Sequence, residues 1–218
     1  MTIALALDVS HHSGELSIGQ FTRAKERGVQ RVIVGVAPAS FPIAGRQIAA
    51  ANAAGLEVEA YIYYYFAQNT TALTEAALSM LPAYVKRVWV DVEDSTSGKT
   101  PSQIAFMARG EYNRILSSGR KSGIYTAKWF WDNHMQGLTV LSDLPLWDAW
   151  WNDKQGMAIR PYGGWNKADL RQIKGDMFFN DIWCDLNVFE HVALDRYNEG
   201  WNDAIKAVRT ALESVKEK

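Results

Sequence analysis

The chain has 218 residues, a length that fits one large domain with a substantial hydrophobic core. Its 23 Lys and Arg residues nearly balance 24 Asp and Glu residues, which removes the electrostatic argument for a nucleic-acid or anionic-membrane partner. The single cysteine, Cys184, cannot form an internal disulfide. No apolar run approaches the roughly 20 residues that cross a bilayer, so we expect no membrane insertion.

Strand-like and helix-like patterns alternate through the first two thirds of the sequence. Helix punctuation is clearest where Pro101 lies in a first turn and Gly119 follows the end. Short strands that alternate with helices of ten or more residues imply parallel βαβ units. In chain order, we predict strands and helices in turn over Ile3–Val9, Ile18–Arg27, Gln30–Val36, Gly45–Ala54, Glu57–Phe66, Thr71–Leu81, Val85–Asp91, Thr100–Ser118 and Ser122–Thr126.

The last third of the sequence has strand patterns with little helical periodicity between them. Gly and Pro residues over Gln155–Asp169 indicate a loop or hairpin. A closing helix is predicted over Asp195–Val215, after strands at Leu146–Trp151, Leu170–Ile173 and Ile182–Val188. About eight strands, about five intervening helices and this C-terminal helix predict an α/β fold, a single irregular TIM-like barrel domain over residues 1–218.

The most informative pattern is Val88-Trp89-Val90-Asp91-Val92-Glu93, a hydrophobic strand that ends in two carboxylates. Because side chains alternate along a strand, Asp91 and Glu93 should point the same way, roughly 6–7 Å apart. That range spans the separations at which two carboxyl groups act on a glycosidic bond. The first and a late strand carry Asp8 and Asp185. Since strand ends build the active site of a parallel barrel, these four acids favour a carbohydrate-cleaving site.

Aromatic residues are candidates for the walls of such a site, because their faces suit sugar rings. The chain holds nine Trp and nine Tyr residues, and for each one a place in the hydrophobic core is the alternative. Trp150 and its neighbour Trp151 are alternatives for one stacking position. The substrate-binding candidates are Tyr61, Tyr63, Tyr125, Trp147 and Trp150. The adjacent pair His11-His12 has poor geometry for a metal, so we expect no metal site.

Six short motifs follow one another along nearly the whole chain. They are Leu7-Asp8-Val9-Ser10 with Gly14, Ala53-Ala54-Gly55-Leu56-Glu57-Val58-Glu59-Ala60-Tyr61, Val90-Asp91-Val92-Glu93, Gly123-Ile124-Tyr125-Thr126, Leu146-Trp147, and Asp185-Leu186-Asn187-Val188-Phe189. In order and spacing they resemble glycoside hydrolase family 25, the Chalaropsis-type lysozymes (N-acetylmuramidases) of phages and bacteria.

The resemblance implies hydrolysis of the β-1,4 bond between N-acetylmuramic acid and N-acetylglucosamine in peptidoglycan, without a metal or cofactor. It implies Glu93 as the general acid/base and Asp91 as the carboxylate that assists at the anomeric centre. Asp8 and Asp185 would be supporting acids. We expect a monomer that binds peptidoglycan glycan strands and no nucleic acid.

The resemblance also implies action on the bacterial cell wall. The first residues lack the basic region and cleavage site of a signal peptide. We therefore expect either cytoplasmic synthesis, as for a phage lysin, or a mature form whose signal has been removed.

The sequence departs from the family pattern in the predicted walls of the groove. Gly35 and the run Val36-Ala37-Pro38-Ala39-Ser40 replace a Lys-Ala-(Thr/Ser)-Glu-Gly segment. Ile62 replaces a His, and Ser13 stands where Gln is common. The four acids remain. Two alternatives stay open: a glycan-binding module of the same fold that has lost turnover, and a hydrolase of another N-acetylated glycan such as chitin.

Overall fold

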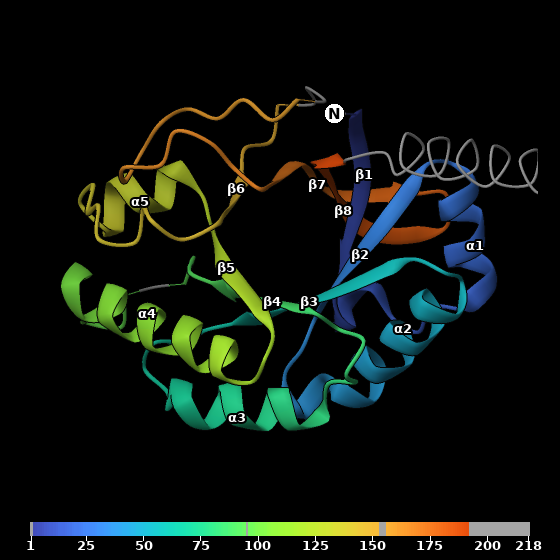
Figure 1. Ribbon diagram of the computed structural model, residues 1–218, viewed down its shortest axis with the longest axis horizontal. Coiled ribbons are helices and arrows are strands. Elements are labelled where there is room, and N and C mark those ends of the chain that lie inside the picture. Colours follow the sequence, from blue (N-terminus) through green and yellow to red (C-terminus); the bar gives the residue numbers. More distant parts are fainter. Residues whose placement is uncertain (1, 95, 153–155, 192–218) are drawn as a thin grey trace, which may run out of the picture.

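The computed structural model describes residues 2–94, 96–152 and 156–191, and its strands close into an eight-stranded barrel (Figure 1). Each strand from β1 to β7 runs parallel to the next, whereas β8 is antiparallel to both β7 and β1. The irregular TIM-like barrel is therefore confirmed. The strands are β1 (Thr2–Val9), β2 (Val29–Gly35), β3 (Glu57–Tyr63), β4 (Arg87–Asp91), β5 (Lys121–Thr126), β6 (Leu146–Ala149), β7 (Leu170–Phe179) and β8 (Ile182–His191).

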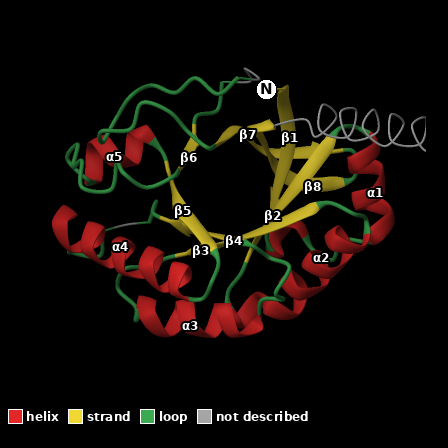
Figure 2. Ribbon diagram, viewed as in Figure 1, coloured by secondary structure: helices red, strands yellow, loops and turns green. Residues whose placement is uncertain are grey.

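Helices cover the outside of the barrel, and α1 to α4 form an arc along one side of it (Figure 2). Capping residues set where three of them begin: the side chains of Ser17, Asn69 and Thr100 accept a backbone N–H of the first turn. The α-helices of the described residues are α1 (Ile18–Glu26), α2 (Phe41–Ala53), α3 (Thr70–Met80), α4 (Pro101–Ser117) and α5 (Lys128–His134). None of them is long and apolar enough to cross a membrane.

The alternation of side chains along each strand creates two separate cores. Val88 and Val90 point outward into the layer between the sheet and the helices, while Trp89 points into the barrel. The barrel interior is filled by one cluster of small, aliphatic and aromatic residues, namely Ala4, Ala6, Ile33, Trp89, Tyr125, Trp147, Leu170 and Phe189. The next inward-facing residue after Trp89 is Asp91. The alternation that fills the barrel interior therefore also places a carboxylate at the C-terminal end of β4.

In an all-parallel barrel, every acid at the mouth would lie at the C-terminal end of its strand. The antiparallel strand β8 is the exception. Asp185 lies near the start of β8, and because this strand runs backwards it pairs with Asp8 near the end of β1. A hairpin between β7 and β8 makes this reversal possible, and it extends β7 to Phe179, beyond the predicted Ile173.

Other boundaries also differ from the predictions. The short helix α5 was not expected; it has aromatic residues at three of seven positions and no side-chain cap. Strands β3 and β6 end at Tyr63 and Ala149, earlier than predicted, and α2 begins earlier, at Phe41. The predicted helix Asp195–Val215 lies outside the described residues, as does the end of the predicted domain.

Candidate active site

The fold brings the four predicted acids to one end of the barrel. Asp8 is the next-to-last residue of β1 and pairs with Asp185 of β8. Asp91 is the last residue of β4, and Glu93 follows it two residues later. The chain beyond β4 stays attached to β5, because Val92 donates to the Tyr125 carbonyl (2.9 Å) and accepts from the Thr126 hydroxyl (2.7 Å). Glu93 is thus held in place although it lies outside the strand.

Burial of this cluster raises the pKa values of its carboxyl groups. Only 2 % of Asp91 is exposed, and burial together with the neighbouring charges of Glu93 and Asp8 raises its pKa well above the usual range. Burial also raises the pKa of Glu93 to about 7, although the neighbouring Tyr125 hydroxyl opposes this shift. Because these groups interact, the cluster retains protons near neutral pH.

Asp8 has a similar environment with more hydrogen bonds. Burial and the charge of Asp185 raise its pKa to about 8, while the amides of Asn187 and Gln172 oppose the rise. The pKa of Asp185 is also raised, mainly by its own burial. The pKa values of both supporting acids are therefore raised above the ordinary value for Asp. The charge of Asp185 in turn raises the pKa of Glu93.

The carboxyl group of Asp91 has an oxygen atom without a hydrogen-bond partner among the residues that the structure describes. Its buried Oδ1 accepts no hydrogen bond from the described residues. An unsatisfied buried acceptor costs about 1–3 kcal/mol, so such an atom is unfavourable unless something else donates to it. A ligand N–H in the mouth of the barrel is the kind of donor that this atom lacks.

Gln172 connects the acids to the aromatic side chains, and sequence reasoning missed it. Its Nε2 donates to Asp8 Oδ2 (3.2 Å) and Asp185 Oδ2 (3.0 Å). Its Oε1 accepts from the Tyr125 hydroxyl (3.1 Å) and the Trp151 indole (2.7 Å). The signal in the sequence is a polar amide inside the predicted strand Leu170–Ile173, where it is only 2 % exposed. All its partners together fix the orientation of the amide.

A second amide, Asn187, also lies beneath the acids. Its Nδ2 donates to Asp8 Oδ2 at 2.6 Å, and its Oδ1 accepts from the Trp147 indole at 2.8 Å. It lies in the motif that carries Asp185, and it is fully buried. Asp8 Oδ2 thus accepts hydrogen bonds from two buried amides, which hold this carboxyl group in place.

The aromatic candidates divide into a floor and a wall. Trp147 is at the centre of the floor, 1 % exposed, with its ring centroid 4.5 Å from that of Tyr125 and 6.0 Å from that of Tyr61. Tyr61 and Tyr63 are half-buried and line a cavity of about 330 Å³ with the exposed Tyr65. Tyr63 and Tyr65 contact each other, with 4.9 Å between ring centroids.

A second cavity, of about 380 Å³, lies against the acids. Asp8 and Asp185 line it, and Ser10, His12 and Tyr61 line both cavities. The two hollows are therefore neighbours across the mouth of the barrel. No Lys or Arg is among the described residues that line them.

The neighbouring tryptophans Trp150 and Trp151 have different environments. The guanidinium groups of Arg160 and Arg171 lie 4.5 Å and 5.0 Å from the ring centroid of the half-buried Trp150. Trp151 is 59 % exposed and joins the site through Gln172. The structure therefore links Trp151, rather than Trp150, to the acids through Gln172.

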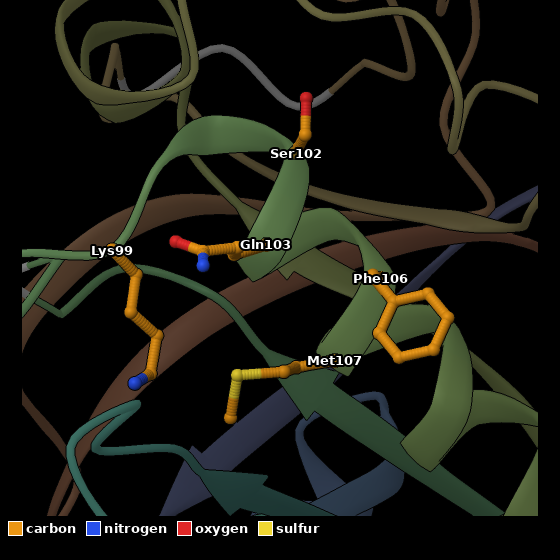
Figure 3. Close-up of a pocket in the computed structure, with 5 residues that line it drawn as sticks. All are labelled: Lys99, Ser102, Gln103, Phe106 and Met107. Carbon is orange, nitrogen blue, oxygen red and sulfur yellow. The ribbon is translucent and has the colours of Figure 1, made fainter.

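Another cavity lies on α4, apart from the acids. Figure 3 shows it lined by Lys99, Ser102, Gln103, Phe106 and Met107. It has no carboxylate among these residues and shares none of them with the two cavities at the barrel mouth.

Comparisons with known proteins agree with this geometry. Residues 7–180 match the family described as glycosyl hydrolases family 25. Over 132 residues the chain is 33 % identical to probable GH family 25 lysozyme 4 of Dictyostelium discoideum, a match that covers 57 % of this chain and 62 % of the relative. It is 27 % identical over 153 residues to probable GH family 25 lysozyme 3 of the same organism, which covers 65 % of this chain. The chain spans only 32 % of that relative's length.

Solved structures have the same fold. A family GH25 lysozyme from Aspergillus fumigatus superimposes with a TM-score of 0.75 at 17 % identity, covering 89 % of this chain and 97 % of that one. A bacterial lysozyme from Streptomyces coelicolor gives a TM-score of 0.71 at 17 % identity, covering 88 % and 94 %. The family match extends from Leu7, near the end of β1, to Asn180, just after β7, and we conclude that this chain belongs to glycosyl hydrolase family 25.

Proposed function

We propose that the protein is a glycoside hydrolase that cleaves the β-1,4 bond between N-acetylmuramic acid and N-acetylglucosamine in peptidoglycan. One observation carries this proposal: Glu93, with a pKa of about 7, lies beside buried Asp91, one oxygen of which has no partner among the described residues. Family membership and relatives named as lysozymes support the choice of substrate.

Glu93 is the proposed general acid and, later, the general base. Its raised pKa keeps it protonated near neutral pH, so it can donate to the glycosidic oxygen as the bond to the anomeric carbon breaks. The resulting carboxylate then takes a proton from the water that attacks the anomeric carbon. The neighbouring Tyr125 hydroxyl lowers the pKa of Glu93 and so favours the charged form between the two steps.

Asp91 is the proposed partner of the sugar's 2-acetamido group. Its unpaired Oδ1 accepts the acetamido N–H, which turns the acetamido oxygen toward the anomeric carbon. That oxygen forms a bond to the carbon as the leaving group departs with the proton from Glu93. Water then opens the cyclic intermediate. Asp8 and Asp185 act through charge, because their carboxyls raise the pKa values of Asp91 and Glu93, respectively.

The aromatic candidates have direct and indirect roles in this proposal. Tyr61 and Tyr63 line the cavity beside the acids and contact the glycan. The buried Trp147 shapes the floor below it, and the half-buried Trp150 packs against the guanidinium groups of Arg160 and Arg171 just after β6. The protein works as a monomer on glycan strands of the bacterial cell wall, without a nucleic-acid partner or membrane insertion.

The test is mass spectrometry of soluble fragments released from purified peptidoglycan by wild type and Glu93→Gln. We expect wild type to release fragments that end in reducing N-acetylmuramic acid and the variant to release none. Release by neither protein would favour the glycan-binding module, and cleavage of chitin oligomers instead would favour the other hydrolase. A sugar trapped covalently on Asp91 would rule out the acetamido route.

A further inference from the structure

Trp151 is a large aromatic side chain that is both exposed and fixed. It follows β6 and is 59 % exposed. Isolated exposed aromatics are normal on protein surfaces, and exposure alone assigns no role. What distinguishes Trp151 is the number of contacts that hold it in one position beside the acids.

The backbone on both sides of Trp151 is bonded to β7. Trp150 N–H donates to the Gln172 carbonyl (3.0 Å), and Asn152 N–H donates to the Ile173 carbonyl (3.1 Å). The indole Nε1–H of Trp151 donates to Gln172 Oε1 at 2.7 Å. Backbone and side chain are therefore fixed by the same strand, so little conformational entropy remains to be lost when a ligand binds.

The ring also lies against the backbone of β7 at a position without a side chain. A Cβ on Gly175 would overlap Cζ2 of the Trp151 indole. The glycine therefore lets the ring lie directly on the strand, with its remaining surface toward solvent. The β7 backbone therefore supports one face of the indole ring, and the other face remains accessible to a ligand.

Gln172 places that surface next to the reacting groups. The amide that accepts the Trp151 indole N–H donates through its other end to the carboxyls of Asp8 and Asp185. A pyranose ring has a face of C–H bonds that packs on an aromatic surface, while its hydroxyls remain free for polar groups at the edge. A sugar on Trp151 would lie one side chain away from the acids.

We infer that Trp151 is the stacking platform for one sugar ring of the glycan, with Gln172 and Gly175 as the residues that position it. This inference rests on the proposed function and assigns a specificity-determining residue to it. It predicts a binding contribution that is separate from proton transfer, because Gln172 retains its bonds to Tyr125 and to the acids when the indole is removed.

The test is calorimetric binding of a soluble tetrasaccharide of alternating N-acetylglucosamine and N-acetylmuramic acid to proteins that carry Glu93→Gln, so that the ligand stays intact. We expect Trp151→Ala to weaken binding about 10-fold or more. Trp151→Phe, which keeps a ring but loses the N–H, should lose less. Gly175→Ala should mimic Trp151→Ala, since its Cβ displaces the ring without removing it.

Trp129→Ala is the matched control. Trp129 is 55 % exposed on α5, and its ring contacts are with Phe130 and His134 rather than with the site. Binding by this variant should equal that of the parent. In the otherwise wild-type enzyme, Trp151→Ala should raise KM and leave the pH profile unchanged.

The outcomes separate the two proposals. Unchanged binding by Trp151→Ala and Gly175→Ala, in a protein whose wild type cleaves the glycan, would overturn the platform and leave the hydrolase intact. An altered pH profile with unchanged KM would also overturn it, because the residue would then act on proton transfer. A wild type that neither binds nor cleaves the glycan would overturn both proposals.

Discussion

Replacing Glu93 by glutamine should remove activity and, above neutral pH, make the protein more stable. In the folded protein the ionised side chain is unfavourable, first because it is buried and then because Asp185 and Asp94 lie nearby. Glutamine has nearly the same shape and does not ionise. The variant therefore separates the electrostatic penalty of this carboxyl group from its contribution to packing.

The size of the effect follows from the pKa values in the two states. The pKa of Glu93 is 4.5 for the ordinary group and about 7 in the fold, so the folded protein holds a proton that the unfolded chain releases between these values. The associated stability is complete below pH 4.5 and is lost as the pH rises through 7. At about 1.36 kcal/mol per pH unit, 7 minus 4.5 gives up to about 3 kcal/mol. The advantage of Glu93→Gln over wild type should grow by that amount from about pH 4 to about pH 8.

Urea denaturation of both proteins at these two pH values measures this difference as free energies of unfolding. Glu190→Gln is a suitable control, because it makes the same chemical change at an exposed position on β8. If the stability difference between Glu93→Gln and wild type stayed constant from pH 4 to pH 8, the raised pKa would be wrong. Glu93 would then lack the proton that a general acid needs near neutral pH.

Four further predictions concern catalysis and packing. The kcat/KM of wild type on a soluble glycan should fall about 10-fold for each pH unit above 7, as Glu93 loses its proton, and a rate that stays flat to pH 9 would contradict its role as the acid. Gln172→Leu should lower kcat at least 10-fold and shift the pH profile, because Asp8 and Asp185 lose their shared donor; an unchanged profile would show that the amide is not needed. Gly123→Ala should lower the free energy of unfolding by about 1–3 kcal/mol, because its Cβ would lie 2.8 Å from the Pro145 carbonyl oxygen. Gly110→Ala, in open space on α4, should instead raise it by about 0.5–1 kcal/mol, and both values are measurable by urea denaturation.

Much of the barrel could be predicted from the sequence because its signals are local. Alternation over Val88–Glu93 and the position of Pro101 in a first helical turn depend only on neighbouring residues, and they indicated the end of β4 and the start of α4. The direction of β8 could not be read in this way. It depends on pairing between β1 and β8, strands that are far apart in the sequence, and on the hairpin that precedes β8.

The candidate site shows the same division. The acids could be proposed from strand ends and from family resemblance, whereas Gln172 gains its importance from partners on four other strands or strand ends. Trp151 also depends on such a partner. The alternation of β6 places Trp147, Ala149 and Trp151 on one side of the chain, so the phase of the strand indicates Trp151 once the end of β6 is known.

The reversal of β8 also decides where the chain enters and leaves the barrel. In an all-parallel barrel of eight strands, the first strand would begin at one pole and the last would end at the other. Here Thr2 pairs with His191, and the Thr2 hydroxyl donates to the His191 carbonyl at 3.3 Å, so both ends of the barrel lie at the pole opposite the acids. A label, a surface tether or a fused protein attached through either end of the barrel would therefore leave the mouth that holds the acids accessible to a polymer as large as a cell wall.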